Sequence, residues 1–185
     1  MARLNKGQSA PLLKGKTSDE EVVDLNDYLG TPFILSFYRY AGCQFCNLRM
    51  KAFIEKYHSE YAPSGIKAIA VFQSPESKMA KNLYKHHEIP FAVVADPKMK
   101  WYKEYGLEKS WAGLAKSSFR LKALVQSISQ GYAKIDPDGP MNRMPADFLI
   151  GSDGTIADCF YAADISEHIS FEKIKTWADS ITVNS

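Results

Sequence analysis

Two cysteines three residues apart are the part of this sequence best suited to chemistry. Cys43 and Cys46 lie in the stretch FYRYAGCQFCNLRM, after an apolar run typical of a buried strand and at the start of a helical pattern. The i, i+3 spacing places both sulfurs on one helical face, close enough to form a disulfide. A helix N-terminus offers free backbone N–H groups and partial positive charge, which lower the pKa of a thiol. The pair therefore predicts a redox couple.

Two further residues are candidates to support this couple. Arg39 precedes the first cysteine by four residues and is either a thiolate-stabilising group or an ordinary surface charge or salt-bridge partner. Pro145 precedes the apolar run ADFLI, where a cis X-Pro bond would present the Met144 backbone to a bound disulfide. Cys159 is expected to be a core thiol, with a resolving role as the alternative.

The main alternative to a redox couple is a zinc site. Cys43 and Cys46 could join His86 and His87, but adjacent histidines lack the usual ligand spacing and the sequence has no second CxxC. We therefore expect no stoichiometric zinc. A pair of inert buried cysteines is the second alternative. The sequence has no phosphate-binding glycine loop, and no cofactor is expected.

The elements that must position the pair follow an alternating order. Strand-like and helical patterns succeed one another through the first half of the chain, which predicts parallel strands joined by crossover helices. Asp153-Gly154 joins two apolar runs and is the strongest hairpin signal in the sequence. We therefore predict one α/β domain over residues 1–185, with a mixed central sheet flanked by helices and a helical insertion at about residues 108–143. The expected helices cover residues 43–61, 76–87, 97–107, 118–128 and 170–181.

Length and composition fit an ordinary globular protein. The chain has 185 residues, 45% apolar and 24% charged, which suits one domain with a substantial core. The net charge of +2 predicts no binding to nucleic acid. The N-terminal segment lacks the apolar core of a signal peptide, and no window approaches the length of a membrane span. We therefore expect a cytoplasmic protein without membrane association, in which a CxxC is more often catalytic or metal-binding than structural.

The order of several motifs resembles the thioredoxin-like superfamily, and within it the peroxiredoxin (AhpC/TSA) branch. The segments that carry this resemblance are GQSAPLL at the start, FILSFYRYAGCQFC at the active-site turn, ADPKMKWYKEYGL after the third strand and ADFLIGSDGTIADCFY at the terminal hairpin. The resemblance covers nearly the whole chain. It implies a thioredoxin-like fold and a thiol-dependent oxidoreductase that acts on a disulfide or a peroxide and is regenerated by a thiol reductant. The resemblance is also compatible with a homodimer.

The sequence also departs from this family in its active-site residues. Peroxiredoxins carry the motif P-x-x-x-T-x-x-C, and aligning the strand ends puts Arg39 on the proline, Cys43 on the threonine and Cys46 on the peroxidatic cysteine. The family's arginine before the hairpin strand falls on Pro145, which instead resembles the thioredoxin proline, and this resemblance implies a cis Met144–Pro145 bond. The spacing is thus similar to that of peroxiredoxins, whereas the CxxC and the proline are similar to those of thioredoxins.

Three functions fit these observations. In disulfide exchange, Cys43 attacks a protein or small-molecule disulfide and Cys46 resolves the mixed disulfide. In peroxide reduction, Cys46 attacks the peroxide and Cys43 condenses with the resulting sulfenic acid. The third function is a redox-inert binding module on the same fold. Because Cys43 lies at the mouth of the turn and Cys46 one turn inside, we expect Cys43 to have the lower pKa and to attack first.

Overall fold

A seven-stranded mixed sheet forms the centre of the computed structural model, which describes residues 2–17, 20–116, 121–132 and 136–182. The strands are β1 (Lys14–Thr17), β2 (Val22–Asp24), β3 (Phe33–Phe37), β4 (Lys67–Phe72), β5 (Ala92–Ala95), β6 (Ala146–Ile150) and β7 (Ile156–Tyr161). Their order is β2-β1-β5-β4-β3-β6-β7. The neighbours β3, β4 and β5 are parallel, and all other pairings are antiparallel. The predicted mixed sheet and terminal hairpin are confirmed.

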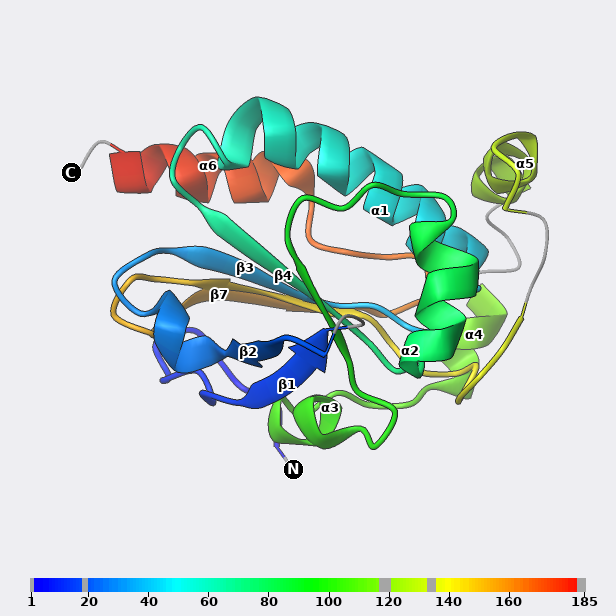
Figure 1. Cartoon of the computed structure of the whole chain (residues 1–185), viewed down its shortest axis with the longest axis horizontal. Helices are drawn as coiled ribbons and strands as arrows, with labels where there is room; N and C mark the ends of the chain where they lie inside the picture. Colours follow the sequence, from blue (N-terminus) through cyan, green and yellow to red (C-terminus); the bar gives the residue numbers. More distant parts are fainter. Residues whose placement is uncertain (1, 18–19, 117–120, 133–135, 183–185) are drawn as a thin grey trace.

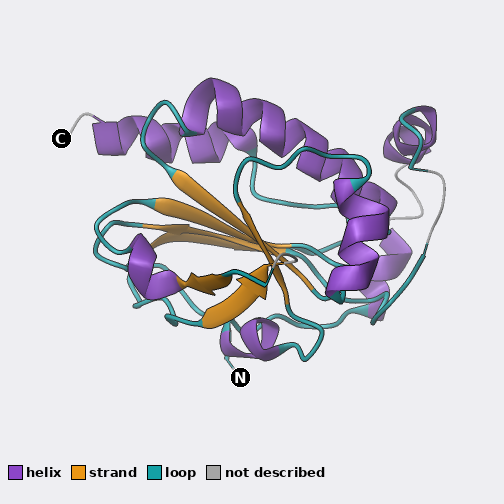
Figure 2. Ribbon diagram, viewed as in Figure 1, coloured by secondary structure: helices purple, strands orange, loops and turns teal. Residues whose placement is uncertain are grey.

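Helices cover both faces of this sheet (Figure 1, Figure 2). They are η1 (Leu25–Tyr28), α1 (Gln44–Lys56) with its extension η2 (Tyr57–Tyr61), α2 (Glu76–Met79) with its extension η3 (Ala80–Tyr84), α3 (Lys100–Glu104), α4 (Trp111–Lys116), α5 (Leu121–Ser129) and α6 (Phe171–Thr182). Helices α1 and α6 lie side by side over one face, and α3 lies on the opposite face (Figure 1). Helix α5 stands at one end of the molecule, in contact with α1.

Strand β3 is apolar along its whole length because both of its faces are covered. Leu35 and Phe37 belong to the core that includes Tyr102 of α3. Ile34 points the other way, into the core that includes Ile174 of α6. A strand buried on both faces reads as a continuous hydrophobic run, which is the pattern that predicted it. The carboxyl end of this fixed strand leads directly into the turn with the two cysteines.

The third predicted helix begins later than its sequence pattern suggests. The pattern starts at Pro97, whereas α3 begins at Lys100. The Asp96 carboxylate accepts hydrogen bonds from the backbone N–H groups of Lys100 and Trp101, at 2.9 and 2.7 Å. Because a carboxylate that caps the first free N–H groups fixes where a helix starts, the intervening residues form a turn instead.

The range predicted as a helical insertion contains two helices where one was expected. Helix α5 corresponds to the predicted helix at residues 118–128, and α4 was not predicted. Residues 117–120, which overlap the predicted helix, lie outside the described residues. The described part of α4 contains Gly113, and a glycine inside a helix weakens the helical pattern in the sequence.

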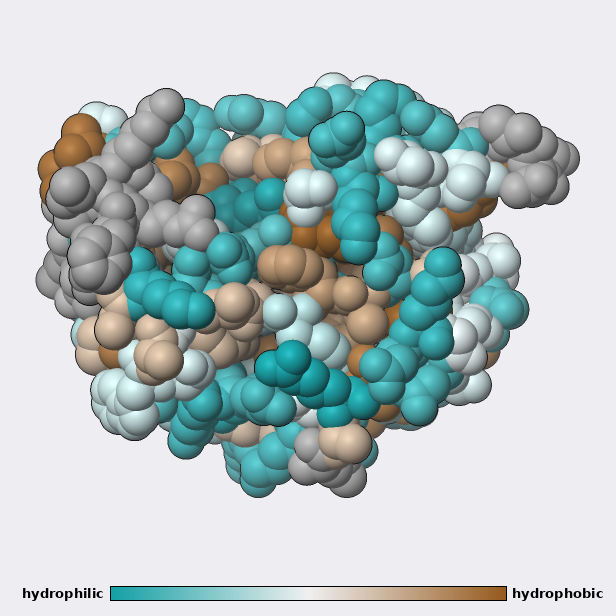
Figure 3. All heavy atoms as spheres, turned by 180° about the vertical axis from the view of Figure 1, so that it is seen from behind, coloured by the Kyte–Doolittle hydropathy of each residue, from teal (hydrophilic) through white to brown (hydrophobic). Residues whose placement is uncertain are grey.

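The surface mixes polar and apolar residues. Seen from behind, hydrophilic side chains surround separate hydrophobic patches (Figure 3). The most exposed large apolar side chains are those of Trp111, Val22, Val125 and Ile128. Three of these four lie in α4 and α5, the two helices after α3. Every helix in the described ranges is too short or too polar to cross a membrane.

Candidate active site

Helix α1 begins directly after Cys43, which is its N-cap residue. The Cys43 backbone is extended, with φ −77° and ψ 120°, and its Sγ accepts a hydrogen bond from the backbone N–H of Cys46 at 3.4 Å. Both cysteines are free thiols and each is 1% exposed. The first turn of a helix therefore holds both sulfurs, in the arrangement that the CxxC spacing predicts.

The guanidinium of Arg39 points at the Cys43 sulfur. Its Nη1 donates to Cys43 Sγ at 3.2 Å, and its Nη2 donates to the backbone oxygen of Met141. The Arg39 side chain is buried, and its Cζ lies 5.0 Å from the centre of the Tyr40 ring. Of the two interpretations that the sequence allows for Arg39, the structure favours contact with the thiol over a surface charge.

These contacts separate the pKa values of the two thiols. Burial by itself raises the pKa of Cys43, but the hydrogen bond from the Cys46 thiol, the charge of Arg39 and backbone N–H groups outweigh it and bring the pKa to about 6. Burial raises the pKa of Cys46 well above its ordinary value, and the neighbouring Cys43 raises it further. Of the two thiols, Cys43 is therefore the one that ionises more readily.

Hydrogen bonds of Asn47 and His87 stabilise the turn that carries the cysteines. Asn47 Nδ2 donates to the backbone oxygens of Ala41 at 2.7 Å and of Cys43 at 3.0 Å. Its Oδ1 lies 3.0 Å from His87 Nε2, and because an amide oxygen only accepts, His87 Nε2 must carry the proton. No motif marks Asn47 in the sequence, and His87 entered only as a candidate zinc ligand.

We expect His87 to make the fold sensitive to acid. Burial, and then the charges of His86 and Lys51, lower the pKa of His87 to about 4. Because this lies below the ordinary value of about 6.5, the group's contribution to stability is complete above pH 6.5 and is lost as the pH falls toward 4. The loss amounts to at most about 3 kcal/mol of unfolding free energy. Urea unfolding at pH 7 and pH 4.5 measures it.

The His87→Gln variant separates this effect from the titration of carboxylates. A glutamine amide can still donate to Asn47 but does not titrate, so the variant should lose less stability between pH 7 and pH 4.5 than the natural chain. His58→Gln is the matched control, because His58 is exposed. An equal acid sensitivity in all three proteins would contradict the assignment.

Gly42 lets a distant segment approach the same turn. It forms an isolated antiparallel bridge with Asp136, and a Cβ at Gly42 would lie 2.9 Å from the Asp136 backbone oxygen. The Asp136 carboxylate accepts from Lys78 Nζ at 2.9 Å and from Asn82 Nδ2 at 3.0 Å. These two donors lower the pKa of Asp136 to about 2, so it is ionised. Through these contacts, Asp136 links the cysteine turn to α2 and η3.

The expected cis Met144–Pro145 bond is wrong, because no peptide bond between described residues is cis. The backbone around this bond is already engaged. Met144 N–H donates to the Glu108 oxygen at 3.1 Å, and the Pro145 oxygen accepts from Ala162 N–H at 3.0 Å. These bonds hold the chain extended into β6. The Met144 N–H is therefore not available to a bound disulfide, which removes the thioredoxin-like part of the resemblance at Pro145.

Cys159 lies away from the couple. It stands on β7 opposite Phe148 of β6, which in turn faces Leu35 of β3. Its Sγ donates to the backbone oxygen of Leu4 at 3.5 Å, and it packs against the core on the α3 side. Cys159 is thus a partly buried thiol on the edge strand β7, packed against the core without belonging to its buried residues.

The ligand set of the alternative zinc site is not assembled. Within the described ranges, no group of three or more Cys, His, Asp or Glu side chains is placed to hold a metal ion. His87 is engaged with Asn47, and the His86 ring stands edge-on to Tyr132 with 5.4 Å between ring centres.

A buried contact between an aspartate and a histidine near the turn could not be expected from sequence. Asp147 is fully buried and lies 3.0 Å from His168 Nδ1, and it accepts from the backbone N–H of Ile169 at 2.8 Å. Burial raises the pKa of Asp147, but His168, the charge of Arg49 and the backbone N–H of Ile169 together reverse this and lower it. This contact connects the segment before α6 to β6. The centre of the His168 ring lies 4.8 Å from the centre of the Tyr38 ring.

The sequence model of the AhpC/TSA family matches residues 6–159 of the chain. Over 121 residues the chain is 28% identical to peroxiredoxin Bcp from Bacillus subtilis (strain 168), covering 61% of this chain and 75% of the relative. Over 106 residues it is 26% identical to the chloroplastic peroxiredoxin Q from Populus jackii, covering 57% of this chain and 49% of the relative. The chain thus spans about half the length of the plant relatives that it matches.

Comparison with solved structures supports the fold. A structure from Chlorobium tepidum, described as a thiol:disulfide interchange protein DsbE, superposes with a TM-score of 0.63 at 19% identity and covers 97% of each chain. At this identity the likeness concerns the fold alone, and it confirms the predicted thioredoxin-like fold. This chain has relatives named peroxiredoxin and shares its fold with a neighbour named for disulfide interchange, so the fold by itself does not choose between the two reactions.

Proposed function

Because the chain belongs to the AhpC/TSA family, we propose that it is a thiol-dependent oxidoreductase with Cys43 and Cys46 as its redox couple. The observation that carries this proposal is the contact of Arg39 Nη1 with Cys43 Sγ at 3.2 Å, in a buried site with a Cys43 pKa of about 6. A buried thiol without such support has a raised pKa and is inert. The buried charge of Arg39 therefore helps to keep the Cys43 sulfur ionised.

In the proposed reaction, the Cys43 thiolate attacks one sulfur of a substrate disulfide. The Cys43–substrate bond forms, the substrate disulfide breaks, and the leaving sulfur departs as a thiolate that takes up a proton. Cys46 then loses its proton and attacks Cys43, which releases the second substrate thiol and leaves a Cys43–Cys46 disulfide. A thiol reductant returns the couple to its starting state. The substrate gains two electrons and the couple loses two.

Peroxide reduction is the second candidate, because the curated relatives carry the name peroxiredoxin. The attacking thiolate would form a sulfenic acid and release water, and the second cysteine would condense with it, releasing another water. The high pKa of Cys46 disfavours it as the first nucleophile, so we assign the attack to Cys43 for either substrate.

We further propose that residues 108–143 are an insertion that covers the active-site turn. Three contacts support this role: Gly42 bridges Asp136, Arg39 donates to the Met141 oxygen, and α5 contacts α1. A cytoplasmic location and a homodimer stay predictions from the sequence.

Counting thiols tests the proposed function. The reduced chain has three cysteines, and treatment with bis(2-hydroxyethyl) disulfide or hydrogen peroxide should remove two of them, with a mass lower by two hydrogens. The loss should map to Cys43 and Cys46 in a peptide digest. The oxidant that acts faster at equal concentration identifies the preferred reaction. A chain that keeps all three thiols under both treatments is the redox-inert module.

A further inference from the structure

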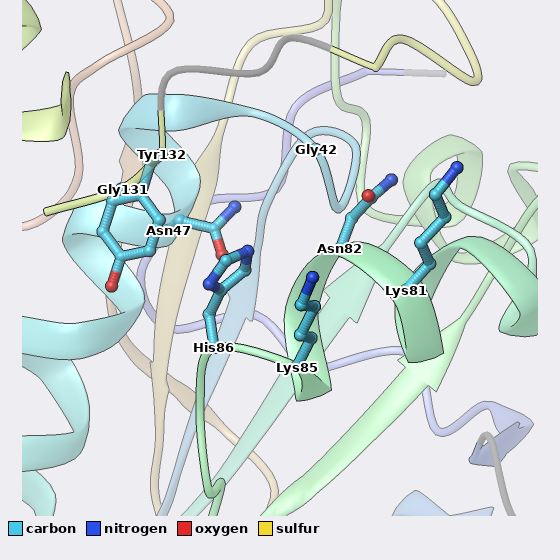
Figure 4. A pocket seen from close by; sticks show the side chains of 8 residues that line it. All are labelled: Gly42, Asn47, Lys81, Asn82, Lys85, His86, Gly131 and Tyr132. Carbon is cyan, nitrogen blue, oxygen red and sulfur yellow. The ribbon is translucent and has the colours of Figure 1, made fainter.

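A cavity of about 220 Å³ lies against the turn that carries the cysteines. One wall is Gly42, the residue directly before Cys43, together with Asn47, which donates to the Cys43 backbone oxygen at 3.0 Å. The remaining wall consists of Lys81, Asn82, Lys85, His86, Gly131 and Tyr132. In Figure 4, the side chains of Lys81, Asn82 and Lys85 point the same way from η3 and the turn after it, bordering one space with Gly42 and Tyr132.

The charged side chains of this cavity are positive. Lys85 is exposed and forms no ion pair with any residue of the described part of the chain. Lys81 lies 3.9 Å from Asp136, a long contact, whereas Lys78 holds the same carboxylate at 2.9 Å. The negative charge of Asp136 is thus already matched, and Lys81 and Lys85 leave uncompensated positive charge at the cavity. Two ammonium groups, an amide and an imidazole supply donors for a carboxylate.

We propose that this cavity binds the anionic arm of a small, carboxylate-bearing disulfide, such as an acidic peptide disulfide, whose sulfur Cys43 attacks. The inference rests on the proposed function and names a substrate class for it. The cavity is smaller than the roughly 300–1,000 Å³ of a site that encloses a whole small molecule. It therefore fits one arm of a molecule, and Gly42 in its wall places that arm against the turn that carries the nucleophile. Holding the substrate there supplies proximity to a sulfur that is only 1% exposed.

The anchored arm remains bound through both steps of the exchange. The Cys43 thiolate forms a bond to the sulfur of the anchored arm, the substrate disulfide breaks, and the other arm leaves as a thiolate. Cys46 releases the anchored arm as a second thiol when it forms the Cys43–Cys46 disulfide. The acidic arm thus stays in the cavity through the mixed-disulfide stage, and the substrate takes up two electrons and two protons in all.

Steady-state reduction of two disulfides tests the proposal. Oxidised glutathione carries carboxylates on both arms, and bis(2-hydroxyethyl) disulfide carries no charge. In the double variant Lys81→Gln/Lys85→Gln we expect the KM for oxidised glutathione to rise about tenfold, since two exposed charge contacts are lost. The KM for the neutral disulfide should change less than about twofold. In the natural chain, added salt should raise only the KM for oxidised glutathione.

The control variant is Lys98→Gln, which removes an exposed lysine from the turn before α3, outside the cavity lining. It should leave both KM values unchanged. Equal rises for the charged and the neutral disulfide, or no rise for either, would overturn the subsite.

A binding measurement keeps the subsite testable if the chain reduces no disulfide. S-methylglutathione has the same carboxylates and cannot exchange, so its binding does not depend on the redox reaction. We expect it to shift the backbone NMR signals of His86, Gly131 and Tyr132 in the natural chain and not in the double variant. Shifts without disulfide reduction would support the subsite while the proposed function fails, and an absence of shifts would reject the subsite.

Discussion

Replacing Cys43 with serine should reduce disulfide exchange to the uncatalysed rate, a loss of about a thousandfold or more, because a serine hydroxyl is not ionised at neutral pH. Replacing Cys46 with serine should instead stop the reaction halfway. The Cys43 thiolate still attacks, but no second thiol can resolve the product, so a mixed disulfide with the substrate accumulates. Intact-mass spectrometry before and after reduction with dithiothreitol identifies this adduct.

Serine is the right replacement for Cys46 because its hydroxyl can still donate to the Cys43 sulfur, as the thiol does. Cys159→Ser is the matched control, and it should exchange disulfides at the natural rate because Cys159 faces the core from β7. The assignment is reversed if Cys43→Ser still consumes peroxide and accumulates a sulfenic acid on Cys46. In that case the protein is a peroxidase with the inner cysteine as nucleophile.

The parts of this molecule that follow from local pattern could be predicted from the sequence. Strand β3 is a continuous apolar run because it is covered on both faces, and the sequence shows that directly. Cys43 is a helix N-cap because a helical pattern begins next to it, and the low pKa follows from that position together with its neighbours. The hairpin was predictable because Asp153-Gly154 favours its turn locally.

The parts that depend on distant contacts could not be predicted. Asp136 reaches Gly42 across the sequence, and nothing near either residue indicates the bridge. The hydrogen bonds of Asn47 depend on the shape of the turn and on a histidine from the end of another helix. Pro145 shows the converse error. The resemblance to the thioredoxin proline favoured a cis bond, but contacts with Glu108 and Ala162, both remote in sequence, hold the chain extended.

Arg39→Met should move the pKa of Cys43 from about 6 to about 8, since an opposite charge at this range lowers a pKa by one to three units. Methionine has a similar volume and no charge, so the buried site stays filled. The titration is followed by thiolate absorbance at 240 nm and by the rate of iodoacetamide alkylation against pH. Arg39→Lys keeps a charge without the fixed fork of donors, and its pKa should fall between the two.

The control is Arg49→Met. Arg49 is a partly buried arginine on α1, the helix that Cys43 caps. Its Cζ lies 3.8 Å from the centre of the Phe171 ring, and its Nη2 donates to the Ile169 oxygen at 2.8 Å. It does not contact Cys43, so the pKa of Cys43 should stay at about 6 in this variant.

The rate at neutral pH is the wrong measurement for Arg39→Met, because two effects nearly cancel there. At pH 7 the thiolate fraction would fall about tenfold, while the more basic thiolate would be about eightfold more reactive for a Brønsted coefficient of 0.4–0.5. The two rate profiles should therefore cross near pH 7, with the variant about tenfold slower at pH 5 and several-fold faster at pH 9. Parallel profiles with a midpoint at about 6 in both proteins would show that the helix N-terminus and Cys46 hold the thiolate without Arg39.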